Sequence, residues 1–229
     1  NLCSRTMRTS IVLSPPTYVA LGGSNSVGHG LKRNETRFSR LVFDGLRADE
    51  PGLVFQDSAI GGMGPIIAGT CRTRYVARAA RFATVEYLPN MGFGDSGELE
   101  AVALLLDELL ERRAKVVLVE ILPRNINNHC RPWCVHLRHV DEQHEKMLAL
   151  ARERGVLSLT IDAGRTAPLF SGDRIHLNNA GHAFVAAQVL HMFRAVSPSP
   201  ERHPKAASPD MGVSCHMGKS LQAAVIGSR

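Results

Sequence analysis

The chain has 229 residues, of which 44% are hydrophobic and 21% are charged, values typical of a folded globular protein rather than a disordered or fibrous one. Its formal charge of +6 would suit a nucleic-acid binder, but only 5% of the residues are aromatic and the basic residues are spread along the sequence. We therefore expect no nucleic-acid partner. No apolar run is long enough to predict a membrane span.

One domain over residues 17–196 is the expected organisation. Residues 1–16 precede it as a short extension. Residues 197–229, in which Ser, Pro, Lys and Gly dominate, are expected to form a disordered tail. The chain begins at Asn1, and its first apolar cluster, Ile11 to Leu13, is too short for the core of a signal peptide. A processed product and a fragment both fit this beginning, so a secretory or extracellular location stays open.

From Thr17 onward, short apolar runs alternate with stretches of helical periodicity, which indicates a parallel sheet covered by helices. Right-handed crossovers between parallel strands then predict a three-layer α/β/α sandwich with a five-stranded sheet in the flavodoxin-like order 2-1-3-4-5. The five predicted strands are Tyr18 to Leu21, Leu53 to Gln56, Ala83 to Tyr87, Lys115 to Ile121 and Val156 to Ile161.

Four helices are predicted from apolar residues at helical spacing, and they cover Phe38 to Leu46, Leu99 to Leu109, Val140 to Ala151 and about Ala180 to Val196. Asp95 or Ser96 is the expected N-cap of the second helix, and Glu98 is favourably placed in its first turn. Gly155 is expected to end the third helix in a left-handed conformation.

The first predicted strand ends in Gly22-Gly23-Ser24, where small residues permit a tight turn and expose a hydroxyl at the edge of the sheet. Ser24 is therefore placed as a nucleophile would be. A glycine-rich turn after a first strand is also typical of nucleotide sites. That alternative fits poorly, because Gly23, Gly28 and Gly30 do not form the GxGxxG pattern and no GK[ST] follows.

A second polar segment, Asp173-Arg174-Ile175-His176, lies between the last strand and the final helix. A serine hydroxyl needs a base to become a nucleophile, and a histidine oriented by a carboxylate is the usual one. Asp173 and His176 could form this pair. On its own the pattern is also compatible with an Asp and a His that only cap the following helix.

Together these segments resemble the SGNH (GDSL-type) hydrolases, and the resemblance runs from about Tyr18 to Val196. The first family block corresponds to Gly22-Gly23-Ser24, the second to Asp57 through Gly64, the third to Leu88 through Met91, and the fifth to Asp173 through His176 followed by Gly181-His182. The chain departs from the common pattern in having Gly23 in place of Asp, Asp57 in place of Asn, and Leu88 and Met91 beside Asn90.

The resemblance implies roles for five residues. Ser24 would be the nucleophile, His176 the base and Asp173 the residue that orients His176. The amides of Ser24 and Gly62 and the side chain of Asn90 would form the oxyanion hole, whose donors are each worth about 3 kcal/mol in such sites.

The expected function is that of a serine esterase without a cofactor. Its substrate would be a carboxylic ester of a small molecule or carbohydrate, such as an O-acetyl group on a sugar. Two alternatives remain: an acyltransferase on the same scaffold, in which a sugar hydroxyl replaces water, and a noncatalytic SGNH-like binding module.

Several other features are weighed and set aside. His129, Cys130, Cys134, His136 and His139 match no familiar zinc spacing, so we expect no metal site and favour a local Cys130–Cys134 disulfide if the compartment is oxidising. Trp133 could line the acyl pocket or serve as a buried anchor. His144 and His182 are expected to be packing residues. The basic residues Arg72, Arg74, Arg78 and Arg81 are interpreted as a solvated helix face.

Overall fold

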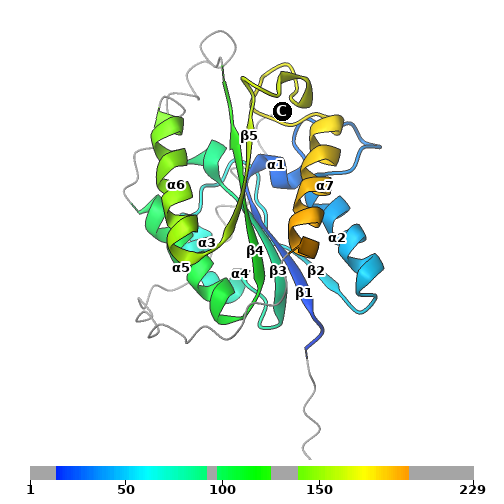
Figure 1. Cartoon of the computed structure of the whole chain (residues 1–229), viewed down its shortest axis with the longest axis vertical. Helices are drawn as coiled ribbons and strands as arrows, with labels where there is room; N and C mark the ends of the chain where they lie inside the picture. Colours follow the sequence, from blue (N-terminus) through cyan, green and yellow to red (C-terminus); the bar gives the residue numbers. More distant parts are fainter. Residues whose placement is uncertain (1–13, 92–96, 125–138, 196–229) are drawn as a thin grey trace, which may run out of the picture.

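The computed structural model describes residues 14–91, 97–124 and 139–195, and its centre is a sheet of five parallel strands in the order β2-β1-β3-β4-β5 (Figure 1). The predicted fold class and strand order are therefore confirmed. The strands are β1 (Thr17–Gly22), β2 (Val54–Asp57), β3 (Ala80–Glu86), β4 (Lys115–Leu122) and β5 (Leu157–Asp162).

Helices cover both faces of the sheet. α2 (Phe38–Asp49) and α7 (Asn179–Ala195) pack against each other on one face, and α3 (Ile66–Thr70), α5 (Glu98–Glu111) and α6 (Val140–Arg154) lie on the other (Figure 1). Short helical segments connect these elements: α1 (Ser24–Val27), α4 (Arg72–Tyr75), η1 (Leu88–Asn90) and η4 (Ala167–Leu169).

The core consists of one apolar layer on each side of the sheet. Val19 and Leu21 pack into the layer beneath α5 and α6, whereas Tyr18 and Ala20 pack into the layer beneath α2 and α7. This alternation follows from the two-residue period of a strand. The central strands β1, β3 and β4 are almost wholly buried and mostly apolar, whereas β2 and β5, at the edges, are partly exposed.

The predicted elements differ from the observed ones mainly at their ends. β3 begins at Ala80 rather than Ala83, because the exposed Arg81 interrupts the apolar run from which the strand was predicted. The N-cap of α5 is Gly97, which makes no capping bond through a side chain, and Asp95 and Ser96 lie outside the described residues. Gly155 ends α6 with φ 61°, as expected.

Two expectations about the ends of the chain fall largely outside the described part. The N-terminal extension is described only for its last three residues, 14–16, and the expected tail lies entirely beyond the described residues. Within the described ranges, no helix combines the length and apolar character that crossing a membrane requires.

Candidate active site

Ser24 is the first residue of α1, directly after the turn that ends β1. The turn is tight on both sides: a Cβ built on Gly22 would lie 2.2 Å from Ser26 Oγ, and Gly28 ends α1 with φ 90°. Neither position tolerates a larger side chain without a shift of the backbone. The glycines of this segment therefore allow a short helical turn that begins with Ser24 at the carboxyl end of the sheet.

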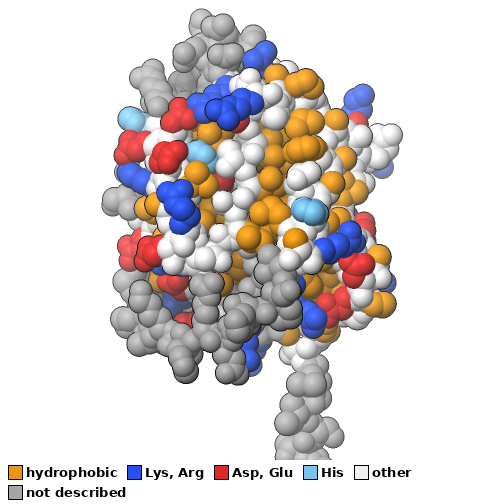
Figure 2. All heavy atoms as spheres, viewed as in Figure 1, with side chains coloured by type: hydrophobic (Ala, Val, Ile, Leu, Met, Phe, Trp, Pro, Cys, Tyr) orange, Lys and Arg blue, Asp and Glu red, His pale blue; other side chains and the backbone are white. Residues whose placement is uncertain are grey.

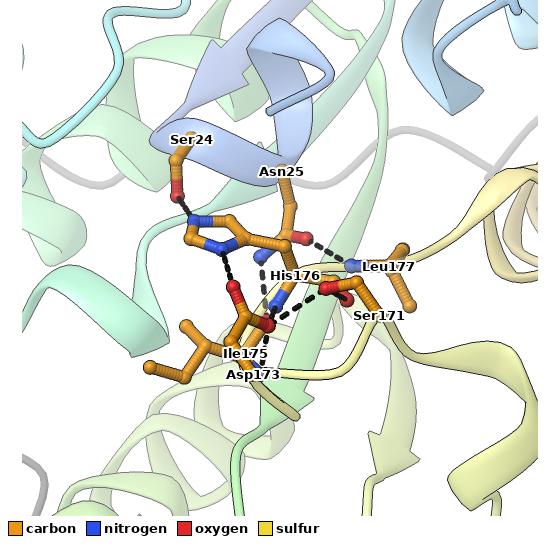
Figure 3. Close-up of polar contacts among 7 residues, drawn as sticks. All are labelled: Ser24, Asn25, Ser171, Asp173, Ile175, His176 and Leu177. Carbon is orange, nitrogen blue, oxygen red and sulfur yellow. Dashed lines mark hydrogen bonds and ion pairs between the residues drawn. The ribbon is translucent and has the colours of Figure 1, made fainter. Parts of the chain in front are cut away.

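His176 and Asp173 lie in line with Ser24, as Figure 3 shows. His176 Nε2 is 3.0 Å from Ser24 Oγ, and His176 Nδ1 is 2.6 Å from Asp173 Oδ2. A carboxylate only accepts hydrogen bonds, so Nδ1 donates to Asp173 and Nε2 is left to accept from the Ser24 hydroxyl. The three residues predicted as a nucleophile, a base and an orienting acid are thus connected by hydrogen bonds.

Asp173 is itself held by its surroundings. Its Oδ1 accepts hydrogen bonds from the amides of Ile175 and His176, at 2.9 and 3.0 Å, and from the Ser171 hydroxyl at 2.7 Å. Partial burial acts to raise the pKa of Asp173, but the bonds from His176, Ile175 and Ser171 outweigh it and hold the pKa well below the usual range. Asp173 is therefore ionised near pH 7.

Asn25 joins the loop of Asp173 and His176 to α1. Its Oδ1 accepts from the amide of Leu177 at 2.9 Å, and its Nδ2 donates to the carbonyl of Ile175 at 3.3 Å (Figure 3). Asn25, the residue after Ser24, thus forms hydrogen bonds with the residues on both sides of His176. The sequence analysis missed this role, because nothing in the spacing of the residues indicates which partner a side-chain amide will find.

His29 lies against the base. The rings of His29 and His176 are 4.5 Å apart between centroids, and the amide of His29 donates to the carbonyl of Ser24 at 2.8 Å. The sequence analysis did not single out His29 either. Its position, five residues after the nucleophile and just past α1, could have suggested that it lies at the edge of the site.

Asn90 lies close to the nucleophile turn. A Cβ built on Gly23 would be 1.8 Å from Asn90 Oδ1 and 3.6 Å from Nδ2, so the side-chain amide occupies the space that a side chain at position 23 would need. This close approach gives a physical reason for a second glycine before Ser24. Asn90 Oδ1 is buried without a hydrogen-bond partner, and Nδ2 is turned away from Gly23.

Gly62 lies in the loop that follows β2. The amides of Ser58 and Ile60 donate to the carbonyls of Ala20 and Gly22, which ties the start of this loop to the end of β1. Gly62 itself is exposed and has φ 72°, a conformation that favours glycine. In the described part of the chain, no hydrogen bond connects Gly62 to Ser24. Ser24, His176 and Asp173 are joined by hydrogen bonds and Asn90 lies against Gly23, whereas Gly62 has no such contact with Ser24 among the described residues.

Glu86, the last residue of β3, is a further residue that the sequence analysis did not single out. It is fully buried, and its Oε2 accepts hydrogen bonds from Gly23 and Ser26, on either side of Ser24. Burial raises the pKa of Glu86 to about 8, against the lowering effect of these bonds. An acidic residue inside an otherwise apolar strand was the sequence signal that could have identified it.

The two histidines expected to be packing residues are both buried. His144 Nδ1 is 2.6 Å from Oε2 of the buried Glu120 on β4. His182 Nδ1 accepts from the amide of Phe38, which links α7 to the start of α2, and its ring stacks on that of Phe38. Burial, followed by the charge of His176, lowers the pKa of His182 to about 4, so His182 is neutral near pH 7.

Most of the residues named in the predictions for the loop after β4 lie outside the described ranges. These are His129, Cys130, Trp133, Cys134 and His136, with the Cys130–Cys134 disulfide. His139 is described, and its Nδ1 lies 3.8 Å from the Glu142 carboxylate. Cys71 is disulfide-bonded, and the other cysteines are outside the described ranges. Within these ranges, no group of three or more His, Cys, Asp or Glu residues is arranged to hold a metal ion.

The expectation of one solvated helix face is wrong, because Arg72 and Arg74 lie on α4 whereas Arg81 lies on β3. Arg72 lies 3.6 Å from Glu108 and Arg81 lies 3.1 Å from Glu50. Arg124, two residues after the end of β4, donates hydrogen bonds to Asp141 and Asp162 at 2.8 and 3.0 Å. Asp57, at the start of the second block, is paired with Arg37. These contacts tie elements together and do not reach Ser24.

No protein-family model matches the sequence, and no curated protein matches it. Solved structures, however, are similar in fold. A two-domain esterase active on acetylated mannans has a TM-score of 0.59 and 18% identity over 85% of this chain, which spans only 54% of that protein. An acetylxylan esterase from Geobacillus stearothermophilus has a TM-score of 0.56 and 18% identity over 82% of this chain and 98% of its own.

A third similar structure is the psychrotrophic esterase EstA from Pseudoalteromonas sp., inhibited by monoethylphosphonate. It has a TM-score of 0.54 and 16% identity, over 78% of this chain and 96% of its own. Three variants of the Geobacillus enzyme, described as catalytic mutants, replace a serine, an aspartate and a histidine by alanine, and that aspartate precedes the histidine by three positions. At these identities the likeness establishes the fold.

Proposed function

We propose that this chain is a serine esterase of the SGNH type that removes short acyl groups, in particular O-acetyl groups, from carbohydrates. The observation that carries the proposal is the hydrogen-bonded line from Ser24 through His176 to Asp173. Its support is the fold, which is shared with esterases that act on acetylated xylan and mannan. In this proposal residues 17–196 form the catalytic domain.

The first half of the reaction would acylate Ser24. His176 Nε2 takes the hydroxyl proton as Ser24 Oγ attacks the ester carbonyl, and a bond forms between Oγ and the acyl carbon. The tetrahedral intermediate then collapses, the bond to the alcohol oxygen breaks, and His176 returns the proton to the departing alcohol. The Asp173 carboxylate stabilises the transient positive charge on the imidazole.

The second half would release the acid. Water takes the place of the alcohol, gives its proton to His176 Nε2 and attacks the acyl carbon, after which the bond to Ser24 Oγ breaks and the proton returns to Ser24. Negative charge forms on the carbonyl oxygen in both halves. The amides of Ser24 and Gly62 and the Nδ2 of Asn90 would donate to that oxygen, and each donor removed costs about 3 kcal/mol in related sites.

The test compares the wild type with Ser24→Ala on two substrates, p-nitrophenyl acetate and an acetylated xylo-oligosaccharide. We expect the wild type to release p-nitrophenol and acetate, and the variant to lose both activities while its circular dichroism spectrum is unchanged. Ser158→Ala, at an exposed serine on the edge strand β5, serves as the control and should keep both activities. Turnover by Ser24→Ala at the wild-type rate would disprove the proposal, and so would an inactive wild type.

A further inference from the structure

A buried carboxyl group lies directly behind the turn that carries Ser24. Glu86 Oε2 accepts from the amide of Gly23 at 3.3 Å, from the amide of Ser26 at 3.1 Å and from the Ser26 hydroxyl at 3.0 Å. Gly23 immediately precedes Ser24, and Ser26 follows it by two residues. One carboxyl oxygen therefore collects donors from both sides of the proposed nucleophile.

The backbone of Glu86 holds the same turn. Glu86 is paired with Gly22 in the register of β1 and β3, and its carbonyl accepts from the amide of Gly23 at 2.9 Å. The fit is close, since a Cβ on Gly22 would lie 2.2 Å from Ser26 Oγ and 2.6 Å from the Glu86 carbonyl oxygen. The path of the chain from Gly22 to Ser26 is thus set by contacts with Glu86.

The position of Glu86 is costly for the fold. Its other carboxyl oxygen, Oε1, is buried without a hydrogen-bond partner, and a buried polar atom without a partner costs free energy. A second buried acid, Glu120 on β4, has the same deficit at its Oε1, but its Oε2 bonds to His144 on α6, away from Ser24. The two acids are similarly buried, but Glu86 bonds to the turn that carries Ser24 and Glu120 bonds to α6.

We propose that Glu86 is a positioning residue for the nucleophile, which by holding Gly23 and Ser26 fixes the direction of the Ser24 hydroxyl and amide. This inference rests on the proposed function of Ser24. Glu86 touches neither substrate nor the reacting atoms, and it acts through the backbone of the turn. A displacement of a reacting group by about 1 Å can cost on the order of 100-fold in rate, so loss of this anchor affects kcat rather than KM.

The ionisation of Glu86 predicts a pH dependence of kcat by which this role can be recognised. Burial, with a smaller effect from the like charge of Glu120 on β4, raises its pKa to about 8. Residues 22–27, on β1 and α1, carry no charged side chain; Tyr87 is adjacent in the chain, and Arg37, before α2, donates to the Ser26 carbonyl at 3.5 Å. As pH rises through about 8, Glu86 becomes negative beside the Ser24 amide, which opposes the charge that forms on the oxyanion.

The experiment measures kcat and KM for p-nitrophenyl acetate from pH 6 to 9.5 in wild type, Glu86→Gln, Glu86→Leu and Glu120→Gln. Glutamine keeps an acceptor and cannot ionise, so Glu86→Gln should stay within about threefold of wild-type kcat at pH 6.5 and lack the fall in kcat above pH 8. Glu86→Leu should lower kcat about 10- to 100-fold with KM unchanged. Glu120→Gln, the control, should keep the wild-type kcat at pH 6.5 and still show the fall, with a midpoint at slightly lower pH because the like charge of Glu120 is removed.

A second readout needs no activity. In NMR spectra of the wild type, the amide signals of Gly23 and Ser26 should shift with a midpoint near pH 8, and these shifts should vanish in Glu86→Gln. They show whether Glu86 titrates against the turn even if the wild type does not turn over or Glu86→Leu does not fold, which separates a failure of the esterase function from a failure of the Glu86 contact. Wild-type kcat in folded Glu86→Leu, a fall above pH 8 that persists in Glu86→Gln, or amide signals that do not titrate would overturn it.

Discussion

Ser24 and His176 are 152 positions apart in the sequence, and their side chains meet because each follows a strand at the same edge of the sheet. This contact differs from a chance hydrogen bond because further hydrogen bonds restrain both residues. Asp173 fixes the proton on His176 Nδ1, Asn25 grips the backbone on both sides of His176, and Glu86 holds the turn of Ser24. Each reacting group thus has a partner that restrains it.

Replacing Asp173 by Asn tests the role of the carboxylate. An amide can donate to His176 Nδ1, which favours the wrong tautomer and leaves Nε2 protonated and unable to accept the serine proton. We expect kcat to fall by about 10³- to 10⁴-fold, as in other Ser-His-Asp enzymes, with the circular dichroism spectrum preserved. Asp44→Asn, at an exposed acid paired with Arg40, is the matched control. A loss of less than tenfold would argue against the triad.

The roles proposed for Ser24, Asp173 and His176 could be formulated from the sequence, because each residue occupies a short segment whose neighbours are also informative. Asn25 could not be found in this way, and the positions of His29 and Glu86 in the sequence indicated a possible role without revealing their contacts. Their functions depend on contacts with residues 60 to 150 positions away, and a polar residue next to a motif or inside a strand has many possible partners before the fold is known. The proposed role of Gly62 stays a prediction.

At the scale of elements, the loop of Asp173 and His176 is held by the helix that follows it. Asn178 donates through its side chain to the carbonyls of Pro168 and Phe170, at 2.8 and 3.0 Å, and its Oδ1 accepts from the amide of Gly181 at 3.0 Å. A Cβ on Gly181 would lie 2.0 Å from the Leu169 carbonyl oxygen. The first turn of α7 therefore packs directly on the backbone of η4, with the loop between them.

Gly181→Ala tests this packing. Alanine stabilises a helix by about 1 kcal/mol relative to glycine, so intrinsic propensity alone predicts a gain in stability. The backbone clash with Leu169 reverses the sign, and we expect a loss of about 1 to 3 kcal/mol in urea denaturation, together with a lower kcat as the loop shifts. Gly172→Ala, whose Cβ would meet nothing within 4 Å, should change neither. A more stable Gly181→Ala variant would show that α7 can move freely from η4.

For the molecule as a whole, the apolar runs and their periodicity were sufficient to predict the sheet, its strand order and the four long helices. The short segments α1 and α3, of four and five residues, were not predicted, because helical periodicity cannot be recognised over so few residues. The helix expected to carry Arg72 to Arg81 extends only over α4. The strand ends were least certain where a charged residue lies inside the strand, as Arg81 does in β3.

The buried ionisable groups predict how the stability of the whole fold depends on pH. The pKa of Glu86 is raised to about 8, so its stabilising contribution is complete below the pKa of an unfolded glutamate and is lost as pH rises toward 8. Burial raises the pKa of Glu120 as well, which acts in the same direction. The pKa of His182 is lowered to about 4, so His182 makes the fold less stable as pH falls. This effect is confined to pH values below about 6.5, the pKa of an unfolded histidine.

We therefore expect the free energy of unfolding to fall between pH 6.5 and 8, with Glu86 contributing at most about 1.4 kcal/mol per pH unit. Glu86→Gln should lose markedly less over this interval, and Asp44→Asn should follow the wild type. Urea denaturation at three pH values across the interval measures the slopes. Equal slopes in wild type and Glu86→Gln would mean that Glu86 is not protonated in the fold near neutral pH.

Reaction with a fluorophosphonate, followed by mass spectrometry of the labelled peptides, tests whether Ser24 is an activated nucleophile. We predict one phosphonylated residue, Ser24, and much slower labelling in His176→Ala, because the hydroxyl then lacks its base. Absence of labelling in the wild type, labelling at another serine, or an unchanged rate in His176→Ala would contradict it.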